Sequence, residues 1–168
     1  MPQPVLRRLT YIAVPSSRRL STPRTDVMTD SPLQSSLAQL ALQWPANWIA
    51  IAVGGTLGCW LRYGQTQLVQ NWLGRDFPSA TLSINVMGSF LMGFLLVATA
   101  ERIDISPAIR LGILTGFLGG YTTFSTFSME TFTLAQNGQI ARALIYACSS
   151  LTLGFLGTAV GVWFARTI

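Results

Sequence analysis

The sequence predicts an all-α membrane protein with four transmembrane helices per subunit. Half of its residues are hydrophobic and only 10% are charged, a balance typical of membrane proteins rather than of soluble domains. The few charges fall at regular intervals and so separate long uncharged stretches. A chain of 168 residues has room for only a few such stretches, since each needs about 20 residues to cross a bilayer.

Residues 1–44 are predicted to form a disordered tail. They are rich in proline, serine, threonine and arginine, and such a composition cannot bury enough apolar surface to fold. A signal peptide is not expected, because "LTYIAV" is too short for the apolar region and is followed by "PSSRR". Met28 opens "MTDSPLQ" just ahead of the hydrophobic part, so it is an alternative start of the native chain.

The membrane domain is predicted over residues 45–168, with spans at about 48–72, 77–100, 108–134 and 140–166. Each is long enough to cross a hydrocarbon core of about 30 Å at about 1.5 Å per residue. The first span carries Arg62 in its second half and has tryptophans at its ends, which suit the membrane interface. Pro78 and Pro107 stand where helices are expected to begin. With four spans, both termini lie on one side of the membrane.

The third span contains "GGYTTFSTFSME", residues 119–130. Two adjacent glycines, Gly119 and Gly120, allow a break in mid-span, and the following hydroxyls can satisfy the freed backbone groups. Such a break exposes carbonyl oxygens that can hold a cation and a half-helix N-terminus that can hold an anion. Phe124 and Phe127 lie on one side of the second half-helix. An aromatic edge can receive an anion, although two phenylalanines at this spacing usually belong to a core.

Polar residues share one face of the second span and one face of the fourth. Thr81, Asn85 and Ser89 are four residues apart, so they lie along one side of a helix. The amide of Asn85 either bonds a neighbouring helix or faces an anion. Tyr146 and Ser150 are also four apart, although hydroxyls in helices commonly bond carbonyls of their own helix.

Arg62 and Glu130 are the charges nearest to or within the spans. They either reach an interface by extending along the helix or meet in the protein interior. An ionisable group inside a membrane is a functional candidate by default, but for Arg62 the anchoring of a helix end is an equal alternative.

The charge bias across the membrane is small. The side with the termini carries Arg102, Arg110 and Arg166, and the other side carries Arg75 and Arg142. A chain with so little bias can insert in both orientations. The alternative is a single orientation with the termini inside, imposed by the arginines of the tail.

Small residues recur at four-residue spacing, which permits close contact between helices within one subunit or between two subunits. These pairs are Gly54 with Gly58, Gly112 with Gly116, Gly116 with Gly120, and Gly157 with Gly161.

Composition argues against several other classes of protein. The eleven basic residues are all arginine and do not cluster beside aromatic residues, so no nucleic-acid partner is expected. The chain has no histidine, which removes the commonest metal ligand and general base, and one Glu at a span edge is little material for an enzyme. Cys59 and Cys148 lie in apolar runs without a motif and are expected to be packing residues.

Three segments resemble the signatures of the fluoride channel family known as Fluc or CrcB: "GGTLGCWLRY" (54–63), "TLSINVMGSFLMG" (81–93) and "GFLGGYTTFSTFSMETF" (116–132). The resemblance covers about residues 50–168 and leaves the tail outside. It implies an antiparallel, dual-topology homodimer in the plasma (cell inner) membrane, with two fluoride paths and one central sodium ion. The implied activity is passive escape of cytoplasmic fluoride.

The resemblance also assigns residues. Sodium would bind the backbone carbonyls of Gly119 and Thr122, Phe124 and Phe127 would line the fluoride path with their ring edges, and Asn85 would donate to the ion. Thr81, Tyr146 and Ser150 would belong to the polar track along the path, with Thr126, Thr152, Glu130 and Arg62 as further candidates. Cys59 and Tyr121 depart from the family pattern, in which a small and an aliphatic residue are usual there.

A small proton-coupled multidrug exporter of dual topology is the alternative. Members of that class resemble one another in having a carboxylate in the first helix, and residues 48–72 contain none.

Overall fold

The structure, a computed structural model, describes residues 32–168, with side chains from residue 44 onward. Its regular elements are all helices. They are α1 (Pro32–Leu73), α2 (Ser79–Glu101), α3 (Pro107–Leu111), the π-helix η2 (Gly112–Phe117), α4 (Leu118–Tyr121), α5 (Phe124–Gln136) and α6 (Ile140–Thr167). The helices predicted over 77–100 and 140–166 correspond closely to α2 and α6. The part of the predicted tail in residues 1–31 lies outside the described residues.

The first helix is longer than predicted. It begins at Pro32, so the assignment of residues 32–44 to a disordered tail is wrong. Leu, Ala and Gln dominate this stretch and are good helix formers, and proline is well tolerated at the first helical position. The helix ends at Leu73, where Gly74 adopts a positive φ of 79° and its N–H bonds the Gln70 carbonyl at 3.0 Å.

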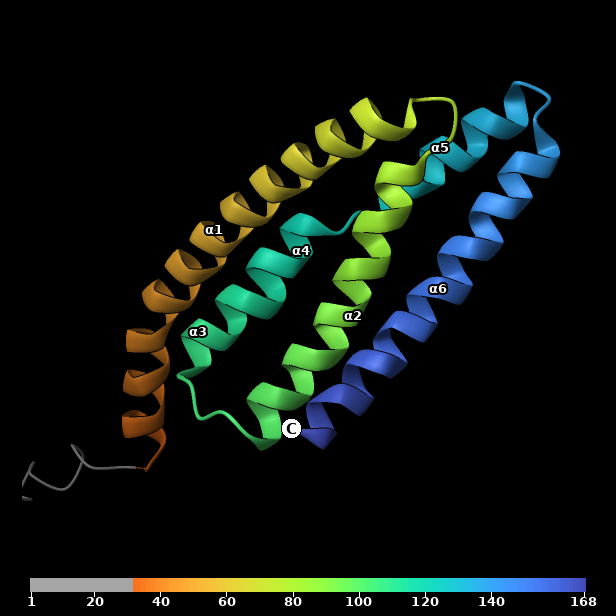
Figure 1. Cartoon of the computed structure of the whole chain (residues 1–168). Helices are drawn as coiled ribbons and strands as arrows, with labels where there is room; N and C mark the ends of the chain where they lie inside the picture. Colours follow the sequence, from red (N-terminus) through yellow and green to blue (C-terminus); the bar gives the residue numbers. More distant parts are fainter. Residues whose placement is uncertain (1–31) are drawn as a thin grey trace, which may run out of the picture.

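The helices form two packed groups that the broken third segment joins. Figure 1 shows α1 lying beside α3 and α4, and α2 lying beside α6 over most of its length. The contacts of α4 are mainly with α1, whereas those of α5 are mainly with α6. The interruption between α4 and α5 therefore carries the chain from one group to the other.

The glycine pairs serve packing inside the subunit. A Cβ at Gly54 or Gly58 would overlap backbone atoms of η2 and α4, and a Cβ at Gly116 would lie 2.7 Å from the Ile51 carbonyl oxygen. Gly161 likewise meets the backbone of α2 at Phe90. The close approach of α1 to the third segment, and of α6 to α2, thus depends on these missing side chains.

Gly58→Ala will destabilise the protein by about 1–3 kcal/mol, because the new methyl group must push the Phe117 carbonyl away. Gly64→Ala on the same helix is the matched control. A Cβ there meets nothing within 4 Å, so the better helix propensity of alanine should make this variant neutral or more stable by up to about 1 kcal/mol. Thermal unfolding in detergent measures both, and equal stability of the two variants would contradict the packing role of Gly58.

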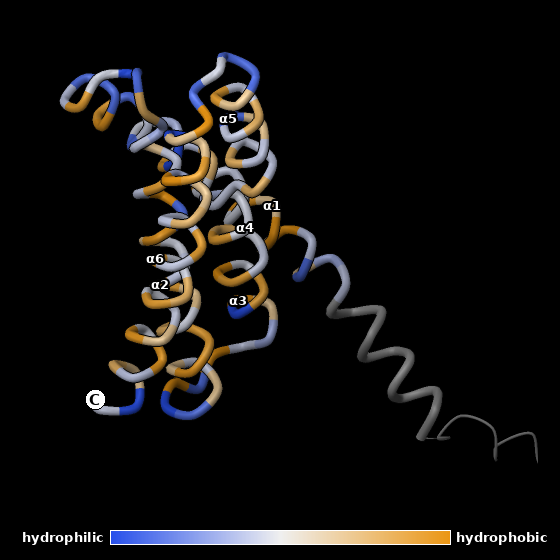
Figure 2. Tube along the Cα trace, turned by 90° about the vertical axis from the view of Figure 1, so that its right-hand side faces the viewer, coloured by the Kyte–Doolittle hydropathy of each residue, from blue (hydrophilic) through white to orange (hydrophobic). Residues whose placement is uncertain are grey.

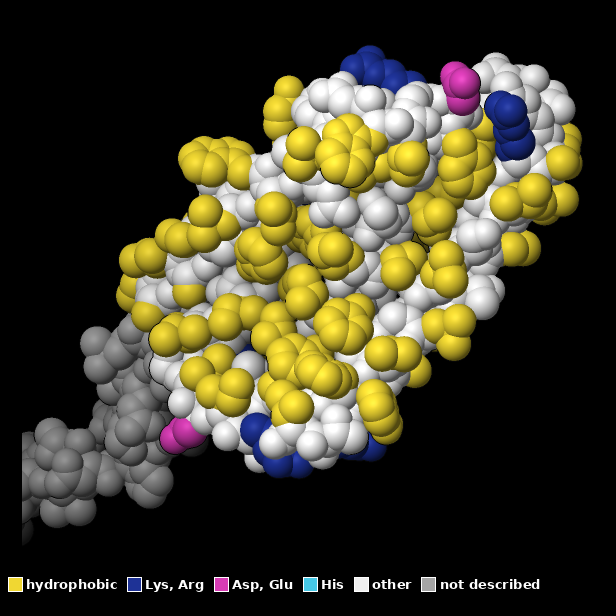
Figure 3. All heavy atoms as spheres, in the orientation of Figure 1, with side chains coloured by type: hydrophobic (Ala, Val, Ile, Leu, Met, Phe, Trp, Pro, Cys, Tyr) yellow, Lys and Arg dark blue, Asp and Glu magenta, His cyan; other side chains and the backbone are white. Residues whose placement is uncertain are grey.

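The outer surface of the bundle is apolar. Two described helices, α2 and α6, are long and apolar enough to cross a membrane. Large hydrophobic side chains such as Trp60, Phe155 and Trp163 are more than half exposed. Figure 2 shows hydrophobic residues along the middle of these helices and hydrophilic ones near their ends, and Figure 3 shows the same distribution over one face. This is the surface of an integral membrane protein, since water would not tolerate so large an apolar area.

Candidate functional site

The site begins at the interruption of the third segment. Thr122 (φ −82°, ψ 158°) and Thr123 (φ −152°, ψ 109°) are extended between α4 and α5. The prediction of a broken helix is therefore correct, but of the residues predicted for the break, Gly119 to Thr122, only Thr122 lies in it, because Gly119 and Gly120 lie within α4. Gly120 is used for close contact, since a Cβ there would lie 2.5 Å from the Gly55 carbonyl oxygen.

Threonine hydroxyls stabilise the two sides of the break. Thr122 Oγ1 donates to the Leu118 carbonyl at 2.9 Å, which completes the end of α4. Thr123 is the N-cap of α5, and its Oγ1 accepts the Thr126 N–H at 3.3 Å while donating to Thr126 Oγ1 at 2.9 Å. The predicted role of the hydroxyls as partners for the freed backbone is thus confirmed.

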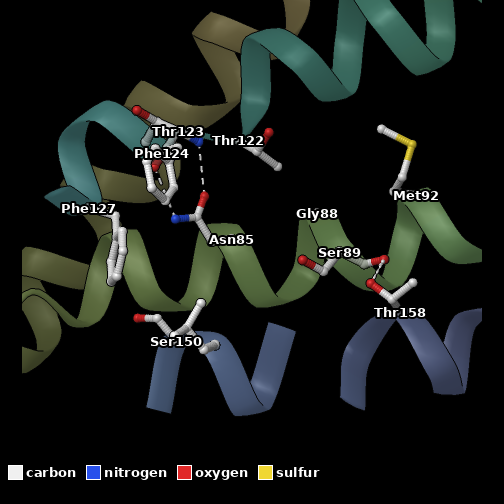
Figure 4. Close-up of a pocket in the computed structure, with 11 residues that line it drawn as sticks. Asn85, Gly88, Ser89, Met92, Thr122, Thr123, Phe124, Phe127, Ser150 and Thr158 are labelled. Atoms are coloured by element: carbon white, nitrogen blue, oxygen red, sulfur yellow. Dashed lines mark hydrogen bonds between the residues drawn. The ribbon is translucent and has the colours of Figure 1, made fainter. Parts of the chain in front are cut away.

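Asn85, on α2, bonds the break through both the nitrogen and the oxygen of its side-chain amide. Its Nδ2 donates to the Thr123 carbonyl at 3.1 Å, and its Oδ1 accepts the Thr123 N–H at 2.9 Å; Figure 4 shows both bonds as dashed lines. The reading of Asn85 as a bond between helices is therefore confirmed. The second N–H of Nδ2 has no hydrogen-bond partner among the described residues.

A cavity of about 310 Å³ lies beside this junction. None of the residues that line it is charged. Figure 4 shows that they come from α2, from the broken third segment and from α6. Ser150 Oγ is buried there without a hydrogen-bond partner among the described residues. The cavity is lined by Asn85, Gly88, Ser89, Met92, Thr122, Thr123, Phe124, Phe127, Ser150, Leu151 and Thr158.

Phe127 lines this cavity and also contacts residues closer to one end of the bundle. Its ring centroid lies 5.3 Å from that of Tyr146 and 5.6 Å from that of Phe124. The Tyr146 hydroxyl donates to Glu130 Oε2 at 2.7 Å, and Thr81 Oγ1 donates to Glu130 Oε1 at 2.9 Å. Tyr146 and Thr81 are buried and Glu130 is half-buried, so two buried hydroxyls hold the carboxylate at the edge of the protein interior.

Glu130 also lines a second cavity, of about 320 Å³, at the end of the bundle. It is also lined by Arg75, Asp76 and Gln139, so charged and polar groups surround this second cavity. The two cavities are thus connected by a series of contacts, from Phe127 through Tyr146 to Glu130.

The structure separates Arg62 from Glu130. Arg62 is half-buried on α1, where its Nη2 lies 3.8 Å from Cys59 Sγ, and that thiol donates to the Gly120 carbonyl at 3.6 Å. No ion pair joins Arg62 to Glu130 within residues 44–168. Of the two alternatives predicted for these charges, their meeting in the protein interior is therefore wrong.

The other predicted residues are placed as follows. Thr126 lies in the first turn of α5 as the partner of Thr123, and Thr152 is exposed on α6 and does not line the cavity. Thr158 was missed, although it lines the cavity and donates to the Ser89 carbonyl at 3.3 Å. The four-residue series Tyr146, Ser150, Gly154, Thr158 contained the signal that places it on the same face.

Two carbonyls beside the break lose the amide donors of a continuous helix. The Thr123 N–H, which a helix would direct to the Gly119 carbonyl, donates to Asn85 instead. The Thr126 N–H, which a helix would direct to the Thr122 carbonyl, donates to Thr123 Oγ1. The described residues hold no cluster of three or more His, Cys, Asp or Glu, so cation binding there would rest on such backbone oxygens.

The fold and this lining define a small helical membrane protein with a cavity among its helices that is lined without charged residues. The chain belongs to the CrcB family: the family described as "CrcB-like protein, Camphor Resistance (CrcB)" matches residues 49–162.

The chain is also similar to proteins with the name "Fluoride-specific ion channel FluC". One from Acidithiobacillus ferrooxidans is 55% identical over 117 residues, which cover 70% of this chain and 94% of the relative. One from Roseiflexus is 46% identical over 123 residues, or 73% of this chain and 98% of the relative. One from Geobacter sulfurreducens is 43% identical over 120 residues, or 71% and 97%.

Proposed function

We propose that this protein is a fluoride-selective channel through which cytoplasmic fluoride leaves the cell passively, which reduces fluoride toxicity. The observation that carries the proposal is a cavity lined by an amide, hydroxyls and two phenylalanine rings without any charged residue, in a chain whose relatives are named fluoride-specific channels. Its location would be the plasma membrane, the cell inner membrane.

The chemistry of the lining suits fluoride. The ion is small and strongly hydrated, so a selective path must replace its water with donors and must avoid a wide aqueous pore. Such donors are the remaining N–H of Asn85, the Ser150 hydroxyl, which has no partner within residues 44–168, and the edges of Phe124 and Phe127. Each of these donors binds fluoride weakly enough for the ion to leave. The second cavity, beside Glu130, opens the path to water.

Four spans and a second copy complete this channel. The spans are α1, α2, the broken segment α3–α5, and α6. Phe124 lines the cavity yet is 76% exposed in one subunit, so another surface must cover it if it faces an ion path. An antiparallel homodimer supplies that surface and gives two paths, and the small charge bias permits insertion in both orientations.

Sodium is proposed as a structural and activating ion at the centre of the dimer. The carbonyls of Gly119 and Thr122 suit it, because their helical donors are directed elsewhere and hard cations prefer oxygen ligands. The exposed position of Gly119 on its subunit leaves this carbonyl side open to a second copy. When bound, the cation would offset the electrostatic cost of a nearby anion.

An efflux assay tests the channel. Purified protein in liposomes should release fluoride at least about a hundredfold faster than chloride, since chloride is too large for donors spaced around fluoride. A fluoride electrode and a chloride electrode measure the two rates, and a cationic drug under a proton gradient serves as a third substrate. Equal rates for the two halides would refute selectivity, and proton-driven drug uptake would favour the multidrug exporter.

A further inference from the structure

A second chain of hydrogen bonds lies on the side of α2 away from the cavity. The Tyr121 hydroxyl donates to Gln65 Oε1, Gln65 Nε2 donates to Ser83 Oγ at 3.2 Å, and Ser83 Oγ donates to the Ala80 carbonyl at 2.9 Å. The chain links α4, α1 and α2. Because Ser83 is two residues from Asn85, the two side chains point to nearly opposite faces of α2.

Tyr121 occupies a special position in this chain. It is the last residue of α4, immediately before the break, and it is fully buried. Its ring is stacked on Phe117 with centroids 6.2 Å apart, and its hydroxyl also lies 3.4 Å from Met87 Sδ. A buried tyrosine hydroxyl needs a partner, and Gln65 provides it.

The fluoride path does not account for these residues. Tyr121, Gln65 and Ser83 line neither the cavity beside the break nor the one beside Glu130. Thr123, the second residue of the break, is held by Asn85 of α2. Tyr121, the residue before the break, is held by Gln65 of α1, which in turn bonds Ser83 of α2. Along the chain, Thr122 lies between these two attached residues, and Gly119 lies two residues before Tyr121.

We propose that Tyr121, Gln65 and Ser83 form a brace that positions the backbone before the break and thereby sets the affinity of its carbonyls for a cation. The three are positioning residues, because they act through the backbone and touch no ion. The inference rests on the sodium site of the proposed function. It predicts that loss of the brace weakens sodium binding while leaving the fluoride cavity and its selectivity over chloride unchanged.

Thermal unfolding of the purified full-length protein in detergent tests the brace. Stability is measured over a series of sodium concentrations, with N-methyl-D-glucamine as the replacement cation. Tyr121→Phe and Gln65→Leu should each raise the sodium concentration for half-maximal stabilisation by about five- to tenfold, the scale of one hydrogen bond. The double variant should shift no further than Gln65→Leu alone, because that change already removes the bond to Tyr121 together with the bond to Ser83.

Two further variants keep the test interpretable. Ser83→Ala removes the last side chain of the hydrogen-bond series with the least change in volume. If the other variants do not fold, it should still shift the sodium dependence in the same direction. Thr56→Val is the control, since the Thr56 hydroxyl bonds the Ala52 carbonyl of its own helix at 2.9 Å. It should leave the sodium dependence unchanged.

The outcomes separate the brace from the channel. Brace variants that are less stable at every sodium concentration, with an unchanged half-maximal value, would show a merely structural role and overturn the proposal. A wild-type protein that transports fluoride selectively but gains no stability from sodium would overturn it as well, while the fluoride channel would stand. Failure of fluoride efflux in the wild-type protein would instead refute the proposed function.

Discussion

Phe127→Ile will lower fluoride efflux by about a hundredfold or more while the protein remains folded. Phe127 lines the cavity beside the break and contacts Tyr146, which leads to Glu130. Isoleucine preserves an apolar side chain but removes the electropositive ring edge that would face the anion. A loss of about 3 kcal/mol in the transfer of the ion past this point corresponds to about a hundredfold in rate. Efflux from liposomes, followed with a fluoride electrode, gives this ratio.

Phe132→Ile is the matched control for this experiment. Phe132 lies on the same helix, α5, and is 57% exposed, but it lines neither of the two cavities beside the break and Glu130. Its replacement should leave fluoride efflux within about twofold of the wild-type rate, since surface substitutions away from a site have small effects. Phe124→Ile should behave like Phe127→Ile. Normal efflux in both variants, with an unchanged elution volume in size-exclusion chromatography, would remove the rings from the path.

Asn85→Asp will block fluoride efflux. The substitution keeps the acceptor for the Thr123 N–H but replaces the donor to the Thr123 carbonyl with an oxygen. It also removes the N–H proposed for the anion and adds a like charge. At about 4 Å, two unit charges at an effective dielectric constant of about 20 repel by about 4 kcal/mol, which corresponds to about a thousandfold in rate.

Asn85→Ala separates the charge from the lost amide. It removes both hydrogen bonds to Thr123 without adding a carboxylate, whereas aspartate keeps the bond from the Thr123 N–H, so the cost of alanine to the break is at least as large. If charge is the main cause of the block, the alanine variant should retain at least about tenfold more fluoride efflux than the aspartate variant. Equal efflux in the two variants, with the same thermal stability, would assign Asn85 a purely structural role.

The helices could be predicted from charge spacing, but their outer limits could not. Uncharged stretches between Asp76 and Glu101 and between Arg142 and Arg166 placed α2 and α6 within about two residues, because a membrane span needs a continuous apolar run. Composition failed at residues 32–44, where proline and serine suggested a tail. These residues form the first part of α1, and extending a helix that has already formed is far easier than starting one.

The broken helix was predictable in kind but not in position. Paired glycines suggested the break, yet Gly120 lies in α4 against Gly55. The chain is interrupted instead at Thr122 and Thr123, where Asn85 replaces the helical partners of Thr123. That bond joins residues 38 positions apart, so no local propensity contains it.

By itself the sequence determined the class of the protein: apolar runs of membrane length, small residues for close helix contact, and polar residues spaced on common faces. These are properties of single helices, which local patterns record. Only the tertiary structure decided which polar groups meet. It placed Glu130 between Thr81 and Tyr146, left Ser150 Oγ without a partner among the described residues beside the cavity, and set Tyr121 against Gln65. A hydroxyl in a helix can bond its own backbone, a neighbouring helix or an ion, and the choice depends on what packing brings within reach.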